Sequence, residues 1–332
     1  MRRPAIVTAV SLAALTTAPA AAQAQLPPSP SPKPAPAPAA QNGQADLSLR
    51  GGMGTRRADY FVPGQRVTVV GTVSPFVSGQ VVTVALRRGR RVTSAKRVAV
   101  GRAGHGRGRF VVRFRVRRRG TLRAVVSHAA TPQQKAFSAA SKRLKVVRFS
   151  AGPGSRGPKV RLLQRGLRRL GFAVPIGGGY GGGTARAVLA YRKTNKMRRT
   201  TGASSRIFSR VFRGRGAFRP RHPRAGYHVE FDWSRQVLAF IRRGRPVAVY
   251  HSSSGAPSTP TVFGRFRFYR KQPGTNSKGM VHSNYFIRGY AIHGYRSVPT
   301  YPASHGCLRV PIPNAKAIDH RIRLGMTIFV YR

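Results

Sequence analysis

The imbalance between basic and acidic residues constrains this chain more than any other feature of its sequence. Its 332 residues include 62 lysines and arginines but only 5 aspartates and glutamates, a formal net charge of +57 at pH 7. Most of the basic side chains therefore have no carboxylate of the same chain to pair with. Hydrophobic residues make up 41% of the sequence, which is enough for two or three folded units of ~100–200 residues each to bury a core.

The excess charge lies in the part of the chain that we expect to fold. Only three basic residues precede Asp46, so residues 46–332 hold the other 59 and all five acids, a net charge of +54. Such a surface attracts polyanions, whether nucleic acid, anionic lipid headgroups or phosphate-rich cell-wall polymers. A coding bias towards arginine would produce part of the same excess without any binding role.

The first 24 residues have the pattern of a secretory signal peptide. Arg2 and Arg3 precede an apolar run over residues 5–15, and small residues follow up to Ala24. The run is about half the ~20 residues that a membrane span requires, and no other segment is long enough, so we expect no membrane span and a secreted or cell-wall location. Export makes genomic DNA a poor partner, and the chain has no recognisable nucleic-acid-binding motif, so we expect none.

A proline-rich linker and a β-rich region follow the signal peptide. Residues 25–45 read QLPPSPSPKPAPAPAAQNGQA, and proline at this density excludes helices and sheet ladders, which predicts an extended linker. Residues 46–148 contain alternating β-branched runs at 66–70, 80–84, 110–114 and 121–125. Their period of two and the turn residues between them predict a small immunoglobulin-like β-sandwich without catalytic residues.

Residues 150–215 change to helical spacing. Apolar residues recur every three or four positions from Val160 to Leu170, and Gly171 provides a stop. We expect Thr184 to cap a second helix and Ser204 or Ser205 to cap a third, giving a small three-helix bundle.

The order of residues in this region resembles the peptidoglycan-binding domain 1 family. The likeness rests on GSRGPKVRLLQRGLRRLGF and GGGYGGGTARAVLAYRK, with departures at Gly178-Gly179 and Tyr191-Arg192, where that family usually has Asp-Gly and Phe-Gln. The resemblance implies binding to the glycan wall, and the alternative is a helical spacer that keeps only its core.

The C-terminal region, residues 225–332, returns to short β runs and contains the only cysteine of the chain. His293 and Gly294 end one run, ten residues separate His293 from Ser304, and Ser304 opens the sequence SHGCLR that holds Cys307. A thiol has a pKa of ~8.5 and needs a base or a positive environment to react near neutral pH. The sequence supplies both next to the thiol.

These residues predict an acyl-transfer site. His293 at a strand end is placed to take the proton of Cys307, with its other ring nitrogen held by a backbone carbonyl such as that of Gly294. Gly306 allows a tight turn in which the N–H groups of Gly306 and Cys307 converge as an oxyanion hole, with the Gly294 backbone beside them. A zinc site built from the two histidines and the cysteine lacks a fourth ligand, so we expect no metal and no cofactor.

The same combination resembles the catalytic motif of the L,D-transpeptidase (YkuD-type) family, in which His-Gly precedes Ser/Thr-His-Gly-Cys-x-Arg/Asn. The likeness extends to VEFDWSRQ at 229–236, to Thr259-Pro260-Thr261 and to residues 325–331. It implies that Cys307 is the nucleophile, that His293 is the general base, and that Ser304, His305 and Arg309 shape the substrate pocket of a β domain.

The resemblance further implies peptidoglycan as the substrate. Members of the family release the terminal D-alanine of a tetrapeptide stem and pass the acyl group to an amine on a neighbouring stem. An L,D-carboxypeptidase would share the acyl-enzyme and differ only in using water. A non-catalytic basic protein that binds anionic wall polymers is the alternative from another class.

Overall fold

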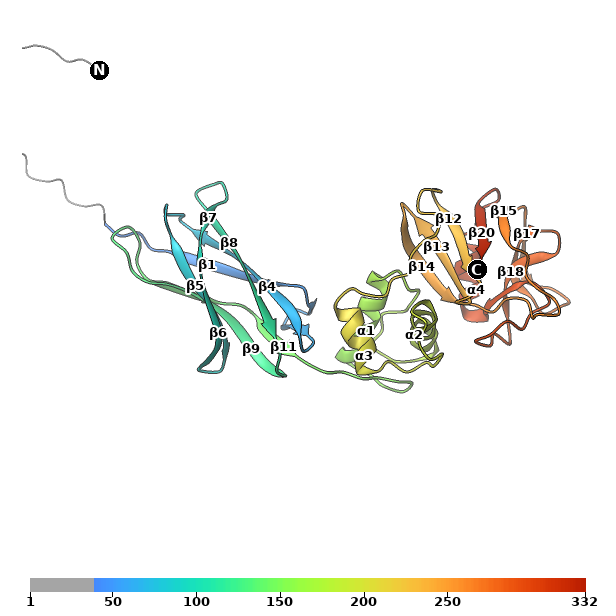
Figure 1. The fold of residues 1–332 in the computed structure, drawn as a ribbon, viewed down its shortest axis with the longest axis horizontal. Helices are drawn as coiled ribbons and strands as arrows, with labels where there is room; N and C mark the ends of the chain where they lie inside the picture. Colours follow the sequence, from blue (N-terminus) through green and yellow to red (C-terminus); the bar gives the residue numbers. More distant parts are fainter. Residues whose placement is uncertain (1–38) are drawn as a thin grey trace, which may run out of the picture. The chain divides into compact units, whose positions relative to one another are not determined.

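The computed structural model describes residues 39–332, so the predicted signal peptide and most of the predicted linker lie outside the described residues. The described part is mainly β, with four helices and four sheets (Figure 1). Within residues 39–332, no helix combines the length and apolar character needed to cross a membrane.

The N-terminal strands form two sheets around one core. The first sheet has four strands in the order β1 (Gln44–Arg50), β4 (Gln65–Ser74), β8 (Gly108–Val116) and β7 (Gly101–Arg102). The second runs in the order β2 (Met53–Gly54), β3 (Ala58–Phe61), β11 (Arg143–Val146), β9 (Gly120–His128), β5 (Val81–Arg88) and β6 (Arg91–Ala99), and β10 (Phe137–Ala140) pairs with β9. The runs predicted at 66–70, 110–114 and 121–125 lie within β4, β8 and β9, and that at 80–84 lies on β5.

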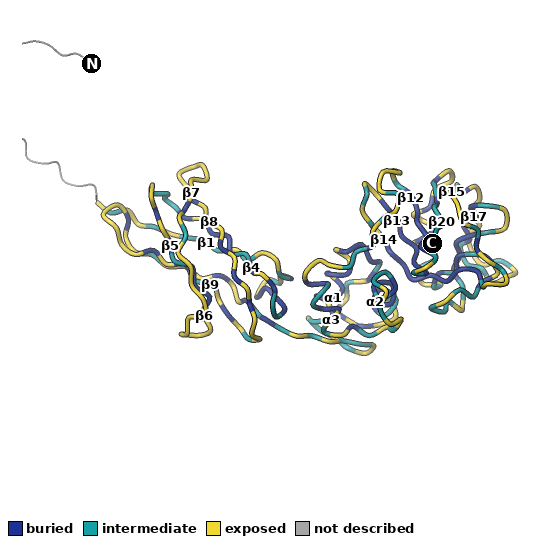
Figure 2. Tube along the Cα trace, viewed as in Figure 1, coloured by how far each residue is buried: buried dark blue, intermediate teal, exposed yellow. Residues whose placement is uncertain are grey.

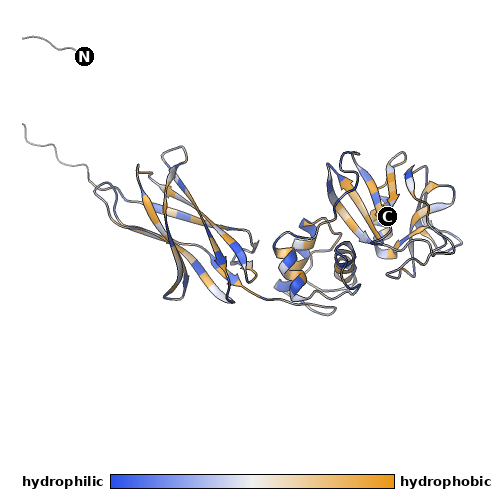
Figure 3. Cartoon of the chain, in the orientation of Figure 1, coloured by the Kyte–Doolittle hydropathy of each residue, from blue (hydrophilic) through white to orange (hydrophobic). Residues whose placement is uncertain are grey.

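Alternation of apolar and basic residues explains why these segments are strands. In β8, Phe110, Val112 and Phe114 are buried while Arg109 and Arg113 are exposed. Successive side chains of a strand point to opposite faces, so one face joins the core and the other carries charge. Figure 3 shows the same alternation of hydrophobic and hydrophilic positions along these sheets.

Three helices follow, α1 (Pro158–Arg169), α2 (Gly182–Thr194) and α3 (Ser205–Phe212). Gly171 adopts a φ of 88° just after α1, as a helix stop requires, and Ser204 is the residue before α3. The predicted cap of α2 is wrong: the helix begins earlier, with Gly181 at its N-cap position. Thr184 is fully buried inside the first turn, where its hydroxyl accepts a hydrogen bond from Gln164 at 2.8 Å.

The C-terminal region contains two further sheets and one helix. A five-stranded sheet has the order β14 (Arg245–His251), β13 (Val237–Arg242), β12 (His228–Asp232), β20 (Thr327–Tyr331) and β15 (Gly264–Arg267). A four-stranded sheet has the order β16 (Arg270–Thr275), β17 (Val281–Ile287), β18 (Tyr290–Tyr295) and β19 (Leu308–Pro311). Helix α4 (Ile312–Asp319) follows β19 directly and contacts β17 and β18.

Strand β13 is buried on both faces, which explains its unbroken apolar sequence. Val237, Ala239 and Ile241 belong to the core built by the three helices. Leu238 and Phe240, which alternate with them, belong to the core of the C-terminal sheets. Figure 2 shows β12 and β13 as a buried stretch between more exposed segments. The helices and the C-terminal sheets therefore share a packed boundary at this strand.

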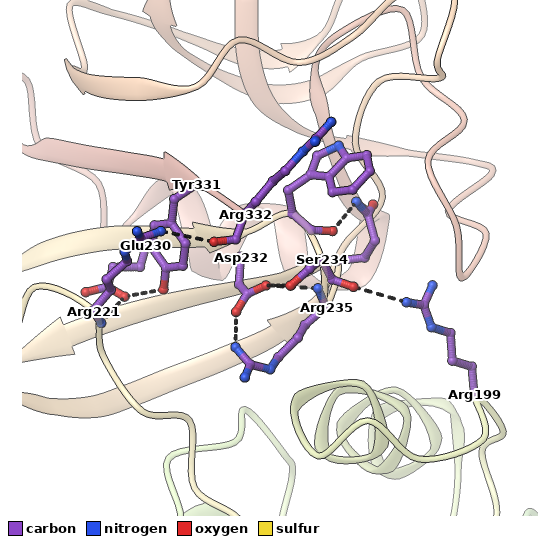
Figure 4. A network of polar contacts seen from close by, with 10 residues as sticks. Arg199, Arg221, Glu230, Asp232, Ser234, Arg235, Tyr331 and Arg332 are labelled. Atoms are coloured by element: carbon purple, nitrogen blue, oxygen red, sulfur yellow. Dashed lines mark hydrogen bonds and ion pairs between the residues drawn. The ribbon is translucent and has the colours of Figure 1, made fainter.

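A buried carboxylate anchors the segment before β12. Glu230 is fully buried and accepts hydrogen bonds from the amides of Arg221 and His222 at 2.9 and 2.8 Å, from His228 Nε2 at 3.1 Å and from the Tyr331 hydroxyl at 2.6 Å. Burial raises the pKa of Glu230, but the hydrogen bonds from His228, Tyr331 and the two amides outweigh it, so the net pKa lies below the ordinary value. Figure 4 shows Glu230 with Arg221 and Tyr331, beside the Asp232–Arg235 ion pair.

Candidate active site

The pairing of β18 with β19 aligns the chain segments that carry the predicted base and the predicted nucleophile. The two strands are parallel, and the register aligns Ile292 with Leu308 and His293 with Arg309. Cys307 immediately precedes β19, two residues before Arg309. Because paired residues of neighbouring strands share a face, His293 and Arg309 lie on the same side of this sheet, and the amide of Ala291 in β18 donates to Sγ of Cys307.

His293 is held as a neutral base. Its ring is almost completely buried, with 2% exposed, and Nδ1 lies 3.0 Å from the carbonyl oxygen of Gly294, which confirms the predicted contact. Since the carbonyl only accepts, Nδ1 carries the proton and Nε2 is left as the basic nitrogen. Burial lowers the pKa of His293, and the charge of Arg309 lowers it further, while the hydrogen bond to Gly294 raises it by less. The imidazole is therefore uncharged at neutral pH.

The thiol of Cys307 is also neutral at rest. The amide of Ala291 donates to Sγ at 3.4 Å, and the thiol donates to the carbonyl of Gly289 at 3.5 Å. Burial raises the pKa of Cys307 above its ordinary value, and the Ala291 amide with the charges of Arg309 and Lys278 opposes this only in part. A neutral thiol needs a base at the moment of attack, which is the function that a neutral imidazole can perform.

A tight turn over residues 304–307 presents the thiol. Gly306 has a φ of 106°, and a Cβ there would lie 2.5 Å from Cε1 of Tyr290, so the position requires glycine on both counts. Ser304 is buried, accepts from the Gly306 amide at 3.1 Å and donates to the carbonyl of Cys307 at 2.5 Å. Thr261, which we had not predicted as a site residue, donates to the carbonyl of Gly306 at 2.6 Å.

Two of the predicted pocket residues have different surroundings. His305 is exposed on the outside of the turn. Arg309 is half-buried: its guanidinium stacks on the ring of Tyr295 at 4.2 Å and donates from Nη1 to the carbonyl of Ala303 at 3.1 Å. Tyr295 in turn lies edge-on to His293, with ring centroids 5.7 Å apart. Sequence reasoning missed Tyr295, although it lies two residues after His293 and hence on the same face of β18.

No group of three or more His, Cys, Asp or Glu side chains suited to a metal ion occurs within residues 39–332. The residues described above offer a thiol, an imidazole, backbone amides and an arginine for chemistry on a substrate.

The family model of the L,D-transpeptidase catalytic domain (YkuD) matches residues 226–330. No curated protein sequence matches the chain.

Solved structures resemble it as well. An L,D-transpeptidase from Xylanimonas cellulosilytica is 31% identical, with a TM-score of 0.51, over 56% of this chain and 98% of that chain. An L,D-transpeptidase from Stackebrandtia nassauensis is 16% identical, with a TM-score of 0.35, over 55% of this chain and 95% of that chain. At 31% identity over nearly the whole of the solved Xylanimonas chain, the protein belongs to the L,D-transpeptidase family.

Proposed function

We propose that this protein is an exported cysteine L,D-transpeptidase that acts on the stem peptides of peptidoglycan through an acyl-enzyme on Cys307. The observation that supports the proposal is the register of β18 against β19, which aligns His293 with Arg309, two residues after Cys307, together with the contact between His293 Nδ1 and the Gly294 carbonyl. Membership of the family adds peptidoglycan as the substrate class.

The reaction follows from the two neutral groups. His293 Nε2 takes the proton of Cys307 as Sγ attacks the carbonyl carbon at the L-centre of diaminopimelate in the donor stem. The imidazolium then gives that proton to the departing amine of D-alanine, leaving a thioester. An amine of a second stem attacks the thioester, His293 removes the proton from that amine, and the thiolate is released and reprotonated.

Backbone amides near the nucleophile stabilise the oxyanion of each step. Because the Gly306 amide donates to Ser304, we assign the oxyanion to the Cys307 amide, with Gly294 acting through the carbonyl that orients His293. Ser304 then stabilises the conformation of the turn. His305 forms the outer wall of the pocket, and Arg309 forms the inner wall.

We further propose the following organisation: a signal peptide at 1–24, a linker at 25–45, an immunoglobulin-like sandwich at 46–148, a wall-binding helical domain at 150–215 and a catalytic domain at 225–332. The linker would give the folded part reach from the site of export into the wall.

Mass spectrometry of muropeptides incubated with the full-length protein tests the function. A transpeptidase yields cross-linked stems together with free D-alanine. An L,D-carboxypeptidase yields D-alanine and shortened stems without cross-links. If neither product forms and the protein is still retained on the wall, it is a basic wall-binding protein and the proposal is refuted.

Replacement of His293 by alanine should slow acylation of Cys307 by at least ~10²-fold at pH 7, the usual loss when a general base is removed. Because burial lowers the pKa of His293, the rate of wild-type acylation should remain constant as the pH is lowered past 6.5. The rate should decrease only at the lower pH at which the imidazole becomes protonated. The variant should instead accelerate with rising pH, as the thiolate forms by itself. Time courses of intact mass with a carbapenem from pH 5 to 9 measure both profiles, and a variant within tenfold of wild type at pH 7 would exclude His293 as the base.

The basic surface should hold anionic wall polymers. A hollow of about 650 Å³ at the ends of α2 and α3 is lined by Lys196, Arg210, Arg215, Arg219 and Arg235, and among the described carboxylates only Asp232 pairs with one of these, Arg235. Retention on purified sacculi should fall steeply between 0.05 and about 0.5 M salt, because each bound phosphate releases counterions.

The double variant Arg215→Gln, Arg219→Gln should lose more of this retention than the control Arg91→Gln, Arg97→Gln on the exposed strand β6. A salt-resistant remainder is expected from neutral contacts of the helical segment. If retention depends neither on salt nor on the presence of wall phosphate, the excess of arginine reflects coding bias and has no binding role.

A further inference from the structure

Lys193, in the last turn of α2, is a buried amine without a carboxylate partner in contact. Only 2% of the residue is exposed. Its Nζ lies 2.8 Å from the carbonyl oxygen of Ser252 and 2.8 Å from Nδ1 of His251. Both partners are neutral acceptors at the end of β14. Burial of an amine among neutral groups costs stability, so the position of Lys193 calls for a reason other than stability.

The contact with His251 continues to the loop beside the active site. Nε2 of His251 lies 2.9 Å from the carbonyl oxygen of Val298. A carbonyl can only accept, so Nε2 carries the proton, Nδ1 is the acceptor, and Lys193 is the donor. Lys193, His251 and Val298 therefore form one directed chain of hydrogen bonds from α2 to the loop over residues 296–303.

This loop, residues 296–303, joins the strand of the base to the turn of the nucleophile. Four of its carbonyl groups accept hydrogen bonds from side chains outside it. The pairs are His251 with Val298, Arg199 with Thr300, Ser253 with Tyr301, and Arg309 with Ala303. Two of the four side chains, Arg199 directly and His251 through Lys193, connect the loop to the helical segment. Figure 4 shows that Arg199 also reaches the turn between β12 and β13, where it donates to the carbonyl of Ser234.

The second contact of Lys193 reaches the strand after the nucleophile. Ser252, whose carbonyl oxygen accepts from Lys193, donates from its own hydroxyl to the carbonyl of Arg309 at 2.8 Å. The adjacent Ser253 exchanges backbone hydrogen bonds with Arg309 at 2.8 and 3.0 Å. Lys193 is thus linked to both neighbours of the catalytic pair, to the loop through His251 and to β19 through Ser252.

We propose that Lys193 is a positioning residue for the transpeptidase reaction, which holds the 296–303 loop and the start of β19 in place through His251 and Ser252. The kinetic part of this proposal rests on the proposed function, whereas the structural part does not. The helical segment then belongs to the catalytic unit, in addition to any contact that it makes with the wall.

The pKa values of Lys193 and His251 are consistent with a buried hydrogen bond between two neutral groups. Burial, with the charge of Arg199, lowers the pKa of Lys193 to about 6. Burial and the charges of Lys193, Arg199 and Arg186 lower the pKa of His251 to about 3, against a smaller rise from its hydrogen bond to Val298. The unfolded chain binds the lysine proton between pH 6 and 10.5 and the folded chain does not, so folding stability should rise with pH in that range.

Lys193→Met in the full-length protein tests the proposal, with Lys316→Met, an exposed lysine in the last turn of α4, as the control. Amide hydrogen exchange in peptides covering 296–303 should become about tenfold faster or more in Lys193→Met only. The kcat should fall about tenfold or more with little change in KM, because the reacting groups are misplaced after the substrate binds. At pH 7 the melting temperature of Lys193→Met should not be lower than that of wild type. Between pH 6 and 10 it should rise less with pH than the melting temperature of wild type does.

A residue kept only for stability would give the opposite result, a lower melting temperature with unchanged kcat of the folded enzyme. Arg199→Gln, with Arg198→Gln as its control, tests the second contact of the helical segment with the loop and decides the matter if Lys193→Met does not fold. The proposal is overturned if Arg199→Gln and a folded Lys193→Met both leave exchange in 296–303 and acylation of Cys307 within twofold of wild type. Were no acylation found even in wild type, the exchange rates alone would still decide whether the helical segment holds the loop.

Discussion

Cys307→Ala will show no covalent adduct with a carbapenem and no acyl transfer, whereas the wild-type protein will gain the mass of one inhibitor. Alanine removes the sulfur that forms the thioester, and no other group of the site can replace it. The chain has a single cysteine, so one adduct on the intact protein identifies the position. Intact-protein mass spectrometry measures both proteins under the same conditions, and an adduct on both would end the assignment.

Cys307→Ser provides the matched control for packing. A hydroxyl keeps the donor towards Gly289 and an acceptor for the Ala291 amide, so the turn should stay intact. Its much higher pKa makes it a far weaker nucleophile for the same base. We therefore expect melting temperatures within a few degrees of wild type and turnover reduced to near background. Substantial turnover in Cys307→Ser would show that sulfur chemistry is not essential.

Glu230→Gln should lower the free energy of unfolding by about 3–5 kcal/mol at pH 7, the typical cost of leaving a buried polar network without its charged partner. The carboxylate accepts from four donors, and the amide nitrogen of glutamine would face some of them with hydrogens of its own. Urea unfolding followed by fluorescence gives the difference. Asp46→Asn, an exposed acid on β1, is the control and should change stability by less than ~0.5 kcal/mol.

The same residue sets an acid limit on stability. The net pKa of Glu230 is lowered in the folded state, so its contribution is complete above the unfolded value of 4.5 and disappears as pH falls through the folded pKa. Wild type should therefore lose stability below pH 4.5 more steeply than Glu230→Gln. Equal slopes for the two proteins would show that the hydrogen bonds around Glu230 do not depend on its charge.

Much of the fold follows from short-range patterns in the sequence. The period-two runs predict β4, β8 and β9, whereas His293, which the sequence pattern puts at a strand end, lies inside β18. Such signals are local because a strand or turn is specified by a few neighbouring residues.

The features that sequence reasoning missed depend on contacts between distant segments. Lys193 meets His251 across 58 positions, and neither residue has a local pattern that distinguishes it from a solvated lysine or an ordinary strand histidine. The engaged Gly306 amide depends on the side-chain rotamer of Ser304, which no spacing rule specifies. The early start of α2 follows from a glycine run, in which the usual capping preference is weak.

The two-sided burial of β13 has a consequence for how this enzyme can be divided and recombined. Val237, Ala239 and Ile241 face the helices, so a fragment beginning near residue 225 would present a bare apolar stripe to solvent. An inhibitor screen that uses the shortest catalytic fragment would use an aggregation-prone protein that lacks the packing of the helices against β13. A gene fusion that exchanges the helical segment for a different module must also supply a matching apolar surface, which makes this junction a poor place for domain shuffling.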